Sequence, residues 1–596
     1  METNSALTSR ALKPSGIPLP VEVEKDLSDF SEMVSRYLRR EIFDDTFRPF
    51  RLMRGVYGQR QGGTNHMIRI KIPSGILTRD QLVRIADIID NYTAHKLGHI
   101  TTRQDIQIHF VQTPDTPTVL RLLYEAGLTT REACGNSIRN VVADPMAGVS
   151  SEEPFDVTPY ARMTSAYFLR HPDSQKLPRK FKINFASSHK NEGQVTFNEI
   201  GLVPKIKAVN GKPVCGFKMY AGGGLGAAPM VGQLLSDFVQ EKDFLRLMHA
   251  IVRIQDRCGD RVNKNQARMK FLVRKIGFEE FKKRVLQEAE ALKAQGVRYP
   301  DIEEYKAKWE EAPPPSPKNP PPKVMLTSPE FNHWKAANVF PQKHKGYSTV
   351  EVLIPIGDMT PAQMRGMAEL STRFADGKVR LSITQNVLIR WVRDEHVLAL
   401  YVELQKLGFP KAGAGQVYDV LACPGADTCN LGITSSKGLA RALNEMFAQG
   451  NGKYEDVKDL TIKISGCPNS CGQHHVAALG FHGAVGTRNG REVPHVQMFF
   501  GGGMDQEVCQ IGRAIMKLPT KKVPEAVERI IALYRKERAP GESIAAYLRR
   551  LDREAAREAL KDLAQVEEYD TNRGVYVDWD QKEEFKLTVG QGECAV

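Results

Sequence analysis

The pattern of hydrophobic and polar positions predicts a mixed α+β fold. "MIRIKIP" (residues 67–73) alternates apolar and polar positions, as a strand with one buried face does. "TRDQLVRIADIIDNY" (residues 78–92) places its apolar residues at helical spacing, and "ITTRQDIQIHFV" (residues 100–111) alternates again. Strand, helix and strand are therefore expected to follow one another in this part of the chain.

The same order of motifs occurs twice, which predicts two homologous halves. "IPSGILTRDQ" matches "IPIGDMTPAQ" at an offset of 282 positions, from Ile72 to Ile354, and without a gap "TTRQDIQIHF" then falls on "ITQNVLIRWV". Farther on, "KMYAGGG" resembles "QMFFGGG", and "LPRKFKINFASS" resembles "LTIKISGCPNSC", a match that sets Ser188 opposite Cys471. Such a duplication is expected to pack as a pseudo-dimer with a ligand where the halves meet.

The remaining segments complete the predicted domain organisation. "EEAPPPSPKNPPPK" (residues 310–323) is too rich in proline for a helix and is expected to run extended over the surface. "VPEAVERIIALYRKER" and "SIAAYLRRLDREAAREALKDL" predict two amphipathic helices. The predicted domains are an N-terminal extension (1–42), two half-domains (43–115 and 346–405), two larger domains (116–309 and 406–518), the linker (310–345) and a C-terminal helical appendage (519–596).

Composition indicates a large globular protein. Its 596 residues exceed what one core holds, and 41% hydrophobic with 26% charged residues is typical of globular chains. No long uncharged apolar run indicates a transmembrane helix, and the first residues lack the basic-then-apolar pattern of a secretory signal. We therefore expect no membrane contact and a cytoplasmic protein, or a stromal one if a short leader has been removed.

The net charge limits the class of partner. Lys and Arg number 83 against 70 Asp and Glu, which gives a formal charge of +13. Such a surface suits nucleic acid, an anionic substrate or an acidic protein partner. The basic residues form no dense run interleaved with aromatic residues, so nucleic acid is not expected.

Four of the nine cysteines lie in two short loops that also contain proline and glycine. The spacing is Cys423-x5-Cys429, then Cys467-x3-Cys471. Clustered cysteines in a large chain without a signal indicate metal binding or redox chemistry rather than disulfides. Zinc knuckles usually have two to four intervening residues, whereas a [4Fe–4S] cluster needs four thiolates, one for each iron. The pattern favours iron–sulfur, with zinc and unligated structural cysteines as alternatives.

The chain resembles the siroheme-containing sulfite and nitrite reductases. The resemblance is carried by C-x5-C…C-x3-C with "GCPNSCG", by "TTRQ" and "LPRKFK" and by the duplicated halves, and extends from about Phe43 to Gly503. It implies an internally duplicated α+β fold with ferredoxin-like half-domains, a siroheme and a [4Fe–4S] cluster. It further implies that Cys471 bridges cluster and siroheme, and that the cluster ligands are Cys423, Cys429, Cys467 and Cys471.

The resemblance also implies a cationic pocket for an anionic substrate and for the carboxylates of siroheme, because buried negative charge must be compensated. Lys180 and Lys182 alternate on an expected strand, so both side chains would leave one face and could deliver protons. The implied substrate-binding residues are Arg69, Arg139, Lys180 and Lys182. The implied cofactor-binding residues are Arg103, Gln107, Arg179, Asn469 and Cys471.

Three further features receive weaker interpretations. His99 stands where a relative would carry arginine, so a structural role is expected there instead of a cofactor contact. Tyr57 and Cys134 correspond to positions that some ferredoxin-dependent members link covalently, and an ordinary buried thiol is the alternative. "GGGLGAAP" fits a dinucleotide-binding pattern only loosely, and both glycine-rich loops are expected to approach the shared cofactor closely.

The activity implied by the resemblance is a six-electron reduction. Sulfite reduction to sulfide is the preferred hypothesis, because Lys182 and the pattern C-P-x3-T-C resemble sulfite reductases. Nitrite reduction to ammonia is the alternative, because "RNVVADPMAG" resembles the nitrite-reducing branch. A non-catalytic iron–sulfur electron carrier is a more distant alternative. No flavodoxin-like or NADPH-binding module is evident, so an acidic ferredoxin is the expected electron donor of an expected monomer.

Overall fold

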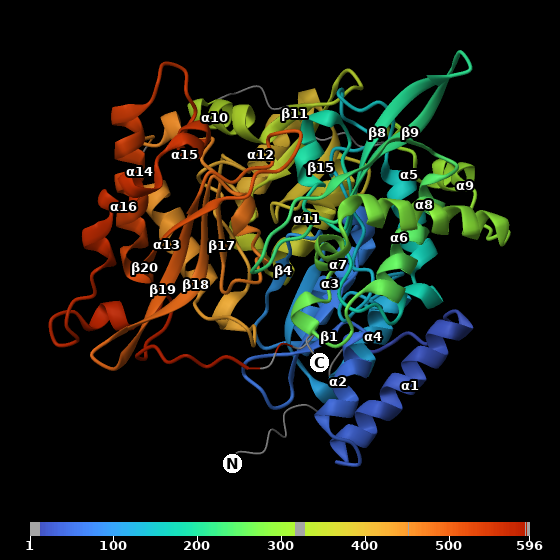
Figure 1. The fold of residues 1–596 in the computed structure, drawn as a ribbon, viewed down its shortest axis with the longest axis horizontal. Helices are drawn as coiled ribbons and strands as arrows, with labels where there is room; N and C mark the ends of the chain where they lie inside the picture. The colour runs from blue at the N-terminus through green and yellow to red at the C-terminus, as the bar shows by residue number, and fades with distance from the viewer. Residues whose placement is uncertain (1–11, 316–327, 451, 591, 593–596) are drawn as a thin grey trace.

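The computed structural model describes residues 12–315, 328–450, 452–590 and 592. Within these residues the strands form four five-stranded sheets, two small and two larger. In Figure 1 the strands β17 to β20 of the second half, in orange, lie to the left of the first half, in blue and green. The predicted internally duplicated α+β fold is therefore confirmed. Among the described helices none is both long and apolar enough to cross a membrane.

The two small sheets exchange an edge strand. One has the order β1-β2-β5-β4-β13 and the other β11-β12-β15-β14-β3, so each ends in a strand from the opposite half. The strands of the first are β1 (Val56–Gly58), β2 (Asn65–Ile70), β5 (Ile106–Gln112), β4 (Gly98–Ile100) and β13 (Asp358–Met359). Those of the second are β11 (Val339–Pro341), β12 (Tyr347–Val352), β15 (Val387–Arg393), β14 (Lys378–Leu381) and β3 (Ile76–Thr78).

Equivalent helices cover these sheets and share one core. α3 (Arg79–Tyr92) and α11 (Pro361–Phe374) each begin with a capping box, formed by Thr78 with Gln81 and by Thr360 with Gln363. Apolar residues from both helices belong to a single buried cluster that spans both halves. The helices α1 (Val21–Leu38), α2 (Asp44–Leu52), α4 (Thr116–Glu125), α10 (Pro329–Asn338) and α12 (Val397–Lys406) pack around this unit.

Each larger sheet begins with parallel strands and ends with an antiparallel hairpin. The strands are β6 (Val142–Ala143), β7 (Ile183–Phe185), β8 (Ile200–Val209), β9 (Lys212–Ala221) and β10 (Gln233–Gln240), and then β16 (Leu421–Ala422), β17 (Ile462–Ser465), β18 (Leu479–Arg488), β19 (Arg491–Phe500) and β20 (Arg513–Pro519). The first is accompanied by α5 (Thr158–Phe168), α6 (Phe244–Cys258), α7 (Met269–Ile276), α8 (Phe278–Ala294) and α9 (Ile302–Trp309). The second is accompanied by α13 (Ser436–Gln449), α14 (Val523–Glu537), α15 (Ile544–Arg550) and α16 (Arg553–Glu558).

The structure corrects the first motif match by one residue. The left-handed residues Ser74 and Ile356 are 282 positions apart, as the sequence match requires. Beyond α3, however, the left-handed residues Gln104 and Gln385 are 281 positions apart. One residue is therefore missing from the second half between its helix and β14. The ungapped match was wrong here because "VLIRWV" (residues 387–392) is apolar at nearly every position, so it carries no clear alternation that would fix the register.

The second match is wrong by four positions. Asp144 N donates to Phe185 O at 3.0 Å, and Cys423 N donates to Ile464 O at 3.2 Å, which fixes an offset of 279 positions. The pairing of β8 with β9 and of β18 with β19 has the same offset. Ser188 therefore corresponds to Cys467, not to Cys471. The counterpart of Cys471 is Glu192.

Other segments differ from the prediction in detail. The segment predicted as one alternating strand over residues 100–111 contains a turn between β4 and β5. The last predicted helix is divided into α15 and α16, because the Asp552 side chain caps a new helix start. α14 shares the core of the sheet β16–β20. The boundaries of the predicted domains stay predictions.

The linker leaves the first half without regular secondary structure, and four of its residues 310–315 are exposed, as expected for a segment that runs over the surface. Glu311 fastens it to the second half, because its carboxylate accepts from Arg380 at 2.8 Å and from Trp391 Nε1 at 3.0 Å, and its side chain is 8% exposed. The sequence did not predict this single buried contact. The rest of the predicted linker, from residue 316, lies outside the described residues.

Candidate cofactor and substrate site

The four clustered cysteines lie at one end of two adjacent parallel strands. Cys423 follows β16 directly, and Cys467 lies two residues after β17, its parallel neighbour. Gly466 N donates to Cys423 Sγ at 3.3 Å, which ties the two loops together. A Cβ on Gly466 would come within 2.5 Å of the Gly425 backbone, so only glycine permits this approach. The strands thus bring the two cysteine pairs to the same edge of the sheet.

The four thiols are close enough to interact electrostatically. Burial raises the pKa of Cys423, Cys429 and Cys467, for Cys429 to about 12, and the Cys471 thiol adds to each rise. Backbone N–H groups oppose the rise at all three thiols. Two of the four cysteines, Cys423 and Cys467, are buried, and four thiolates so close together are unfavourable unless bound metal compensates their charge. The thiol set therefore fits a metal group.

The spacing of the thiols distinguishes a cluster from zinc. Among the described residues, one group of three His, Cys, Asp or Glu has its ligand atoms within 4.8 Å of one another, and it is His171, Asp173 and His249. No three of the four cysteines are therefore that close. Sulfur atoms about 2.3 Å from one tetrahedral zinc would lie roughly 3.8 Å apart. The wider arrangement suits a cluster with one cysteine per iron.

The two halves meet at Cys471. Thr102 Oγ1, in the first-half motif "TTRQ", donates to Cys471 O at 2.8 Å. In return, Gln473 Nε2 donates to Thr102 O at 3.3 Å. Lys180 is near enough for the Cys471 thiol to raise its pKa against the stronger effect of burial. The predicted bridging cysteine thus faces predicted cationic residues of the other half.

Two arginines of the predicted substrate set are held in fixed orientations. Arg139 donates from Nη1 to Ala133 O at 3.0 Å and from Nη2 to Gly135 O at 2.8 Å. Arg69 on β2 donates from Nε to the amide oxygen of Gln107, its partner on β5, at 3.1 Å. Tyr57 lies between them, with its ring 5.4 Å from the Arg69 guanidinium and its hydroxyl accepting from Arg139 at 3.4 Å. The Gln107 amide thus fixes the direction of the Arg69 guanidinium.

Lys180 and Lys182 flank a buried residue just before β7. Phe181 between them is 1% exposed and forms an isolated bridge with Ile138, so the two lysines leave the same side of the chain. They precede the strand instead of lying on it as predicted, but the alternation holds. Burial lowers the pKa of both lysines, and the Arg103 and Arg268 guanidiniums lower that of Lys182 further. This crowding of cations favours bound anions.

Arg103 and Arg179 belong to the same cationic group. Arg103 donates to Asn198 Oδ1 at 3.1 Å and to Ile183 O at 2.9 Å, while its buried Nε has no partner among the described residues. Arg179 lies close enough to lower the pKa of Lys180. Asn469 is exposed, and its backbone N–H points to the Cys467 thiol. An unpaired buried donor amid excess positive charge is the environment that a polycarboxylate macrocycle requires.

Three further cations were missed from the sequence. Arg268 pairs with the buried Glu199 and lies beside Lys182. Lys270 donates to Leu225 O at 3.0 Å, and burial lowers its pKa to about 7. Burial also lowers the pKa of Lys463, on β17, to about 7. In "ARMKFL" and "LTIKIS" these residues resemble ordinary basic positions on amphipathic elements, and only their burial distinguishes them.

The weaker candidates have contacts within the protein. His99 Nδ1 lies 2.8 Å from Asp358 Oδ1 of the other half, and burial lowers its pKa to about 4. This buried hydrogen bond between the halves supports the expected structural role. Tyr57 packs against Cys134 in a small apolar cluster, and their covalent bond stays a prediction.

The glycine-rich loops reach across to the opposite half. Gly226 O, in the first loop, lies 3.1 Å from His475 Nε2. In the second loop, Glu507 accepts from Lys218 of the first half at 2.5 Å, and Cys509 N donates to Thr196 Oγ1 of the first half at 2.9 Å. A Cβ on Gly223 would come within 2.4 Å of a carbonyl oxygen of its own half. Close packing within their own half accounts for these glycines, and the predicted approach to the cofactor stays a prediction.

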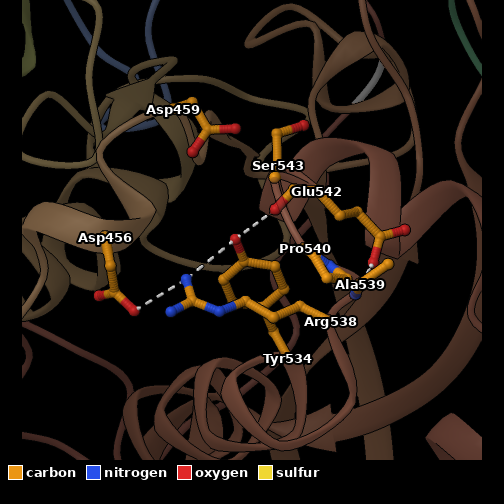
Figure 2. A pocket seen from close by; sticks show the side chains of 9 residues that line it. Asp456, Asp459, Tyr534, Arg538, Ala539, Pro540, Glu542 and Ser543 are labelled. Carbon is orange, nitrogen blue, oxygen red and sulfur yellow. Dashed lines mark hydrogen bonds and ion pairs between the residues drawn. The ribbon is translucent and has the colours of Figure 1, made fainter.

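Two surface hollows differ in their relation to this site. One, of about 530 Å³, lies between residues 456–459 and the segment joining α14 to α15 (Figure 2). There Arg538 bonds Asp456 and the Tyr534 hydroxyl, and no predicted site residue lines it. The other, of about 420 Å³, is lined by Pro468 of the second cysteine loop and by Ala227 and Pro229 of the opposite half. Only the second adjoins the candidate site.

The geometry agrees with comparisons to known proteins. The family model "Nitrite and sulphite reductase 4Fe-4S domain" matches residues 134–293 and 413–567, and the "Nitrite/Sulfite reductase ferredoxin-like half domain" matches residues 57–126 and 340–407. The chain is 29% identical to the chloroplastic ferredoxin–nitrite reductase of Zea mays, over 75% of each chain. It is 26% identical to the assimilatory ferredoxin-dependent nitrite reductase of Haloferax mediterranei, over 87% of this chain and 88% of that one. The NirA protein of Mycobacterium tuberculosis has the same fold, with a TM-score of 0.72, 22% identity and coverage of 90% of this chain and 98% of that one.

These matches define an oxidoreductase built from duplicated ferredoxin-like and 4Fe-4S domains. The chain belongs to the nitrite and sulphite reductase family. Its cofactors are siroheme and a [4Fe–4S] cluster, as the resemblance implied.

Proposed function

We propose that this chain reduces nitrite to ammonia with six electrons from reduced ferredoxin. The proposal corrects the preference for sulfite, because the similar proteins described above are named ferredoxin-dependent nitrite reductases. The observation that carries it is the group of cations beside Cys471, in which the half-buried Lys180 and Lys182 lie together. An excess positive charge of +13 suits an acidic donor protein, whose docking should weaken as salt rises.

The cysteines and a set of cations are proposed to hold the cofactors. Cys423, Cys429, Cys467 and Cys471 would hold the cluster, and Cys471 would also hold the siroheme. Arg103, Arg179, Gln107 and Asn469 line the macrocycle, together with Arg268, Lys270 and Lys463. When bound, the cofactors supply an iron that takes the anion and a path for single electrons.

The substrate cations bind the anion and supply protons. Arg139 and Arg69 keep their charge throughout, and the carbonyls and the amide that hold them fix their direction. Lys180 and Lys182 have lowered pKa values in the absence of an anion. A bound anion between them favours their charged form, so each can hold a proton until an N–O bond of the substrate breaks.

Sulfite reduction is the second candidate, and one residue favours it. Lys182 resembles the sulfite-reducing branch of the family, and its side chain joins the same cationic group as Lys180. A second ammonium group suits sulfite, which carries more negative charge and one more oxygen than nitrite.

The experiment that tests both candidates compares kcat/KM for nitrite and for sulfite with reduced ferredoxin. We expect the larger value for nitrite in the unchanged enzyme. Lys182→Asn should lower kcat/KM for sulfite more than for nitrite, and Lys176→Asn, an exposed lysine in the same segment, is the matched control. A larger value for sulfite in the unchanged enzyme would reverse the assignment. The monomeric state and the cytoplasmic location stay predictions.

A further inference from the structure

Two segments distant in sequence hold the loop of Cys429 (residues 427–432) from outside. One is the turn between β1 and β2, and the other is the C-terminal strap (residues 586–590). Four carbonyl oxygens around Cys429 accept hydrogen bonds from these segments: Asp427 O from Gln61 Nε2 at 2.6 Å, Thr428 O from Arg60 N at 3.0 Å, Asn430 O from Gly590 N at 2.9 Å and Gly432 O from Arg60 Nη1 at 2.7 Å. The loop is thus fixed on both sides of its cysteine.

Arg60 contacts both the loop and the strap. One end of its guanidinium donates to Gly432 O, and Nη2 donates to Thr588 O in the strap at 2.5 Å. Its backbone N–H bonds the loop as well. Gly62 and Gly63, both with positive φ, allow the turn that presents Arg60 in this direction. One side chain therefore joins two segments that lie 372 and 528 positions from it in the sequence.

Arg60 also brings a positive charge to Cys429. Its side chain is half-buried, and among the charged groups near it the Cys429 thiolate most strongly opposes the effect of burial on its pKa. A nearby cation stabilises a thiolate. It also stabilises the more negative, reduced state of a bound cluster, because net charge and hydrogen bonds set the cluster potential.

We propose that Arg60 is a positioning residue that fastens the Cys429 loop to the C-terminal strap and thereby retains the cluster and raises its potential. The inference rests on the proposed role of Cys429 as a cluster ligand. The two effects have separable causes, since retention needs the forked hydrogen bonds and the potential needs the charge.

The first test measures iron release from the anaerobic, reduced holoenzyme to an excess of a ferrous chelator. Arg60→Gln should release iron about ten-fold faster than the unchanged enzyme, the scale expected when a group that orients a metal ligand is lost. Gly590→Pro, which removes the strap's N–H donor without changing charge, should also accelerate release. Arg488→Gln is the matched control, because Arg488 bonds Glu568 in the C-terminal segment at 2.6 Å and none of the cysteine loops.

The second test measures the midpoint potential of the cluster by a redox titration followed by electron paramagnetic resonance. Arg60→Gln should have a more negative potential, and Arg60→Lys should keep the potential while releasing iron faster, because one ammonium cannot span both carbonyls. Equal release from Arg60→Gln and the control would overturn the inference and leave the proposed function intact. Unchanged iron content in Cys429→Ser would instead contradict the ligand assignment.

Discussion

The two halves place different chemistry on equivalent loops. At the offset fixed by the backbone hydrogen bonds, the four clustered cysteines of the second half correspond in the first half to Asp144, Ser150, Ser188 and Glu192. The backbone is the same at both places, since Ser150 N donates to Met146 O as Cys429 N donates to Gly425 O, both at 3.0 Å. The side chains alone decide which loop can hold a cluster. In the first half a carboxylate–lysine pair stands in place of Cys471.

The residues proposed to bind the substrate show the opposite difference, because the first half carries them and the second half does not. Arg69 on β2 corresponds to Glu351 on β12, and each lies opposite an equivalent residue of the neighbouring strand. Lys182, whose carbonyl accepts from Ile200 N, corresponds to Thr461, whose carbonyl accepts from Leu479 N. The four predicted substrate-binding cations thus belong to the first half, and the four clustered thiols belong to the second. We expect the duplicated scaffold to make one composite site from these unequal halves.

The largest expected effect comes from removing Cys471, the proposed ligand of both cofactors. Cys471→Ser should lose the cluster and siroheme absorption and lower nitrite reduction by at least about a hundred-fold, because a hydroxyl is a poor ligand for this iron. Ser188→Ala, at the first-half counterpart of Cys467, should leave spectrum and activity unchanged. The absorption spectrum and iron content of the purified variants provide the measurement. A cysteine variant with full siroheme content would contradict the composite site.

The next largest expected effect comes from removing one of the proposed substrate-binding cations. Lys180→Met should lower kcat/KM for nitrite by roughly 10²- to 10⁴-fold, the range for loss of a positioned proton donor and anion ligand. Cofactor content should remain. Thr461→Val changes the second-half counterpart of Lys182 and should have no comparable effect on kcat/KM. Steady-state kinetics should be measured with reduced ferredoxin and then with a small viologen as electron donor. The fold loss in kcat/KM should be the same with both donors if the change affects substrate turnover and not the docking of ferredoxin.

The sequence predicted the parts of this comparison that depend on residue type and order. The duplicated fold followed from repeated motifs, and the thiol set from the spacing of four cysteines. The register of the strands and the contact partners did not follow, because the segment of residues 177–188 alternates in the same way at offsets that differ by an even number of residues. The burial of Glu311, Lys270 and Lys463 depends on segments distant in sequence, and no local pattern contains that information.

A third test concerns the pH dependence of stability in the symmetry mate of the substrate site. Burial raises the pKa of Glu351 to about 7, and the nearby Asp419 carboxylate adds to this rise. Between about pH 4.5 and 7 the folded protein therefore holds a proton that the unfolded chain has released. Its contribution to the free energy of unfolding is complete below about pH 4.5 and is lost as the pH rises through about 7, by up to about 3 kcal/mol. The two carboxyls titrate as a pair, so the measured slope belongs to both. Urea unfolding between about pH 5 and 8 should show a shallower decline for Glu351→Gln, and an equal slope would exclude this carboxyl as its source.

The smallest expected effect comes from changing Glu192, the first-half counterpart of Cys471. Glu192 is 3% exposed and bonds Lys218 at 2.6 Å and the Tyr220 hydroxyl. Glu192→Gln keeps the shape and a hydrogen bond, and Lys218 retains Glu507, so the free energy of unfolding should fall by about 1–3 kcal/mol. Siroheme and cluster content should stay at the level of the unchanged enzyme, because this loop has only a packing role. Urea unfolding of Glu192→Gln beside Glu507→Gln, which removes the exposed partner of the same lysine, separates loss of the buried contact from loss of surface charge. Loss of siroheme from Glu192→Gln alone would show that the first-half loop still takes part in holding the cofactor.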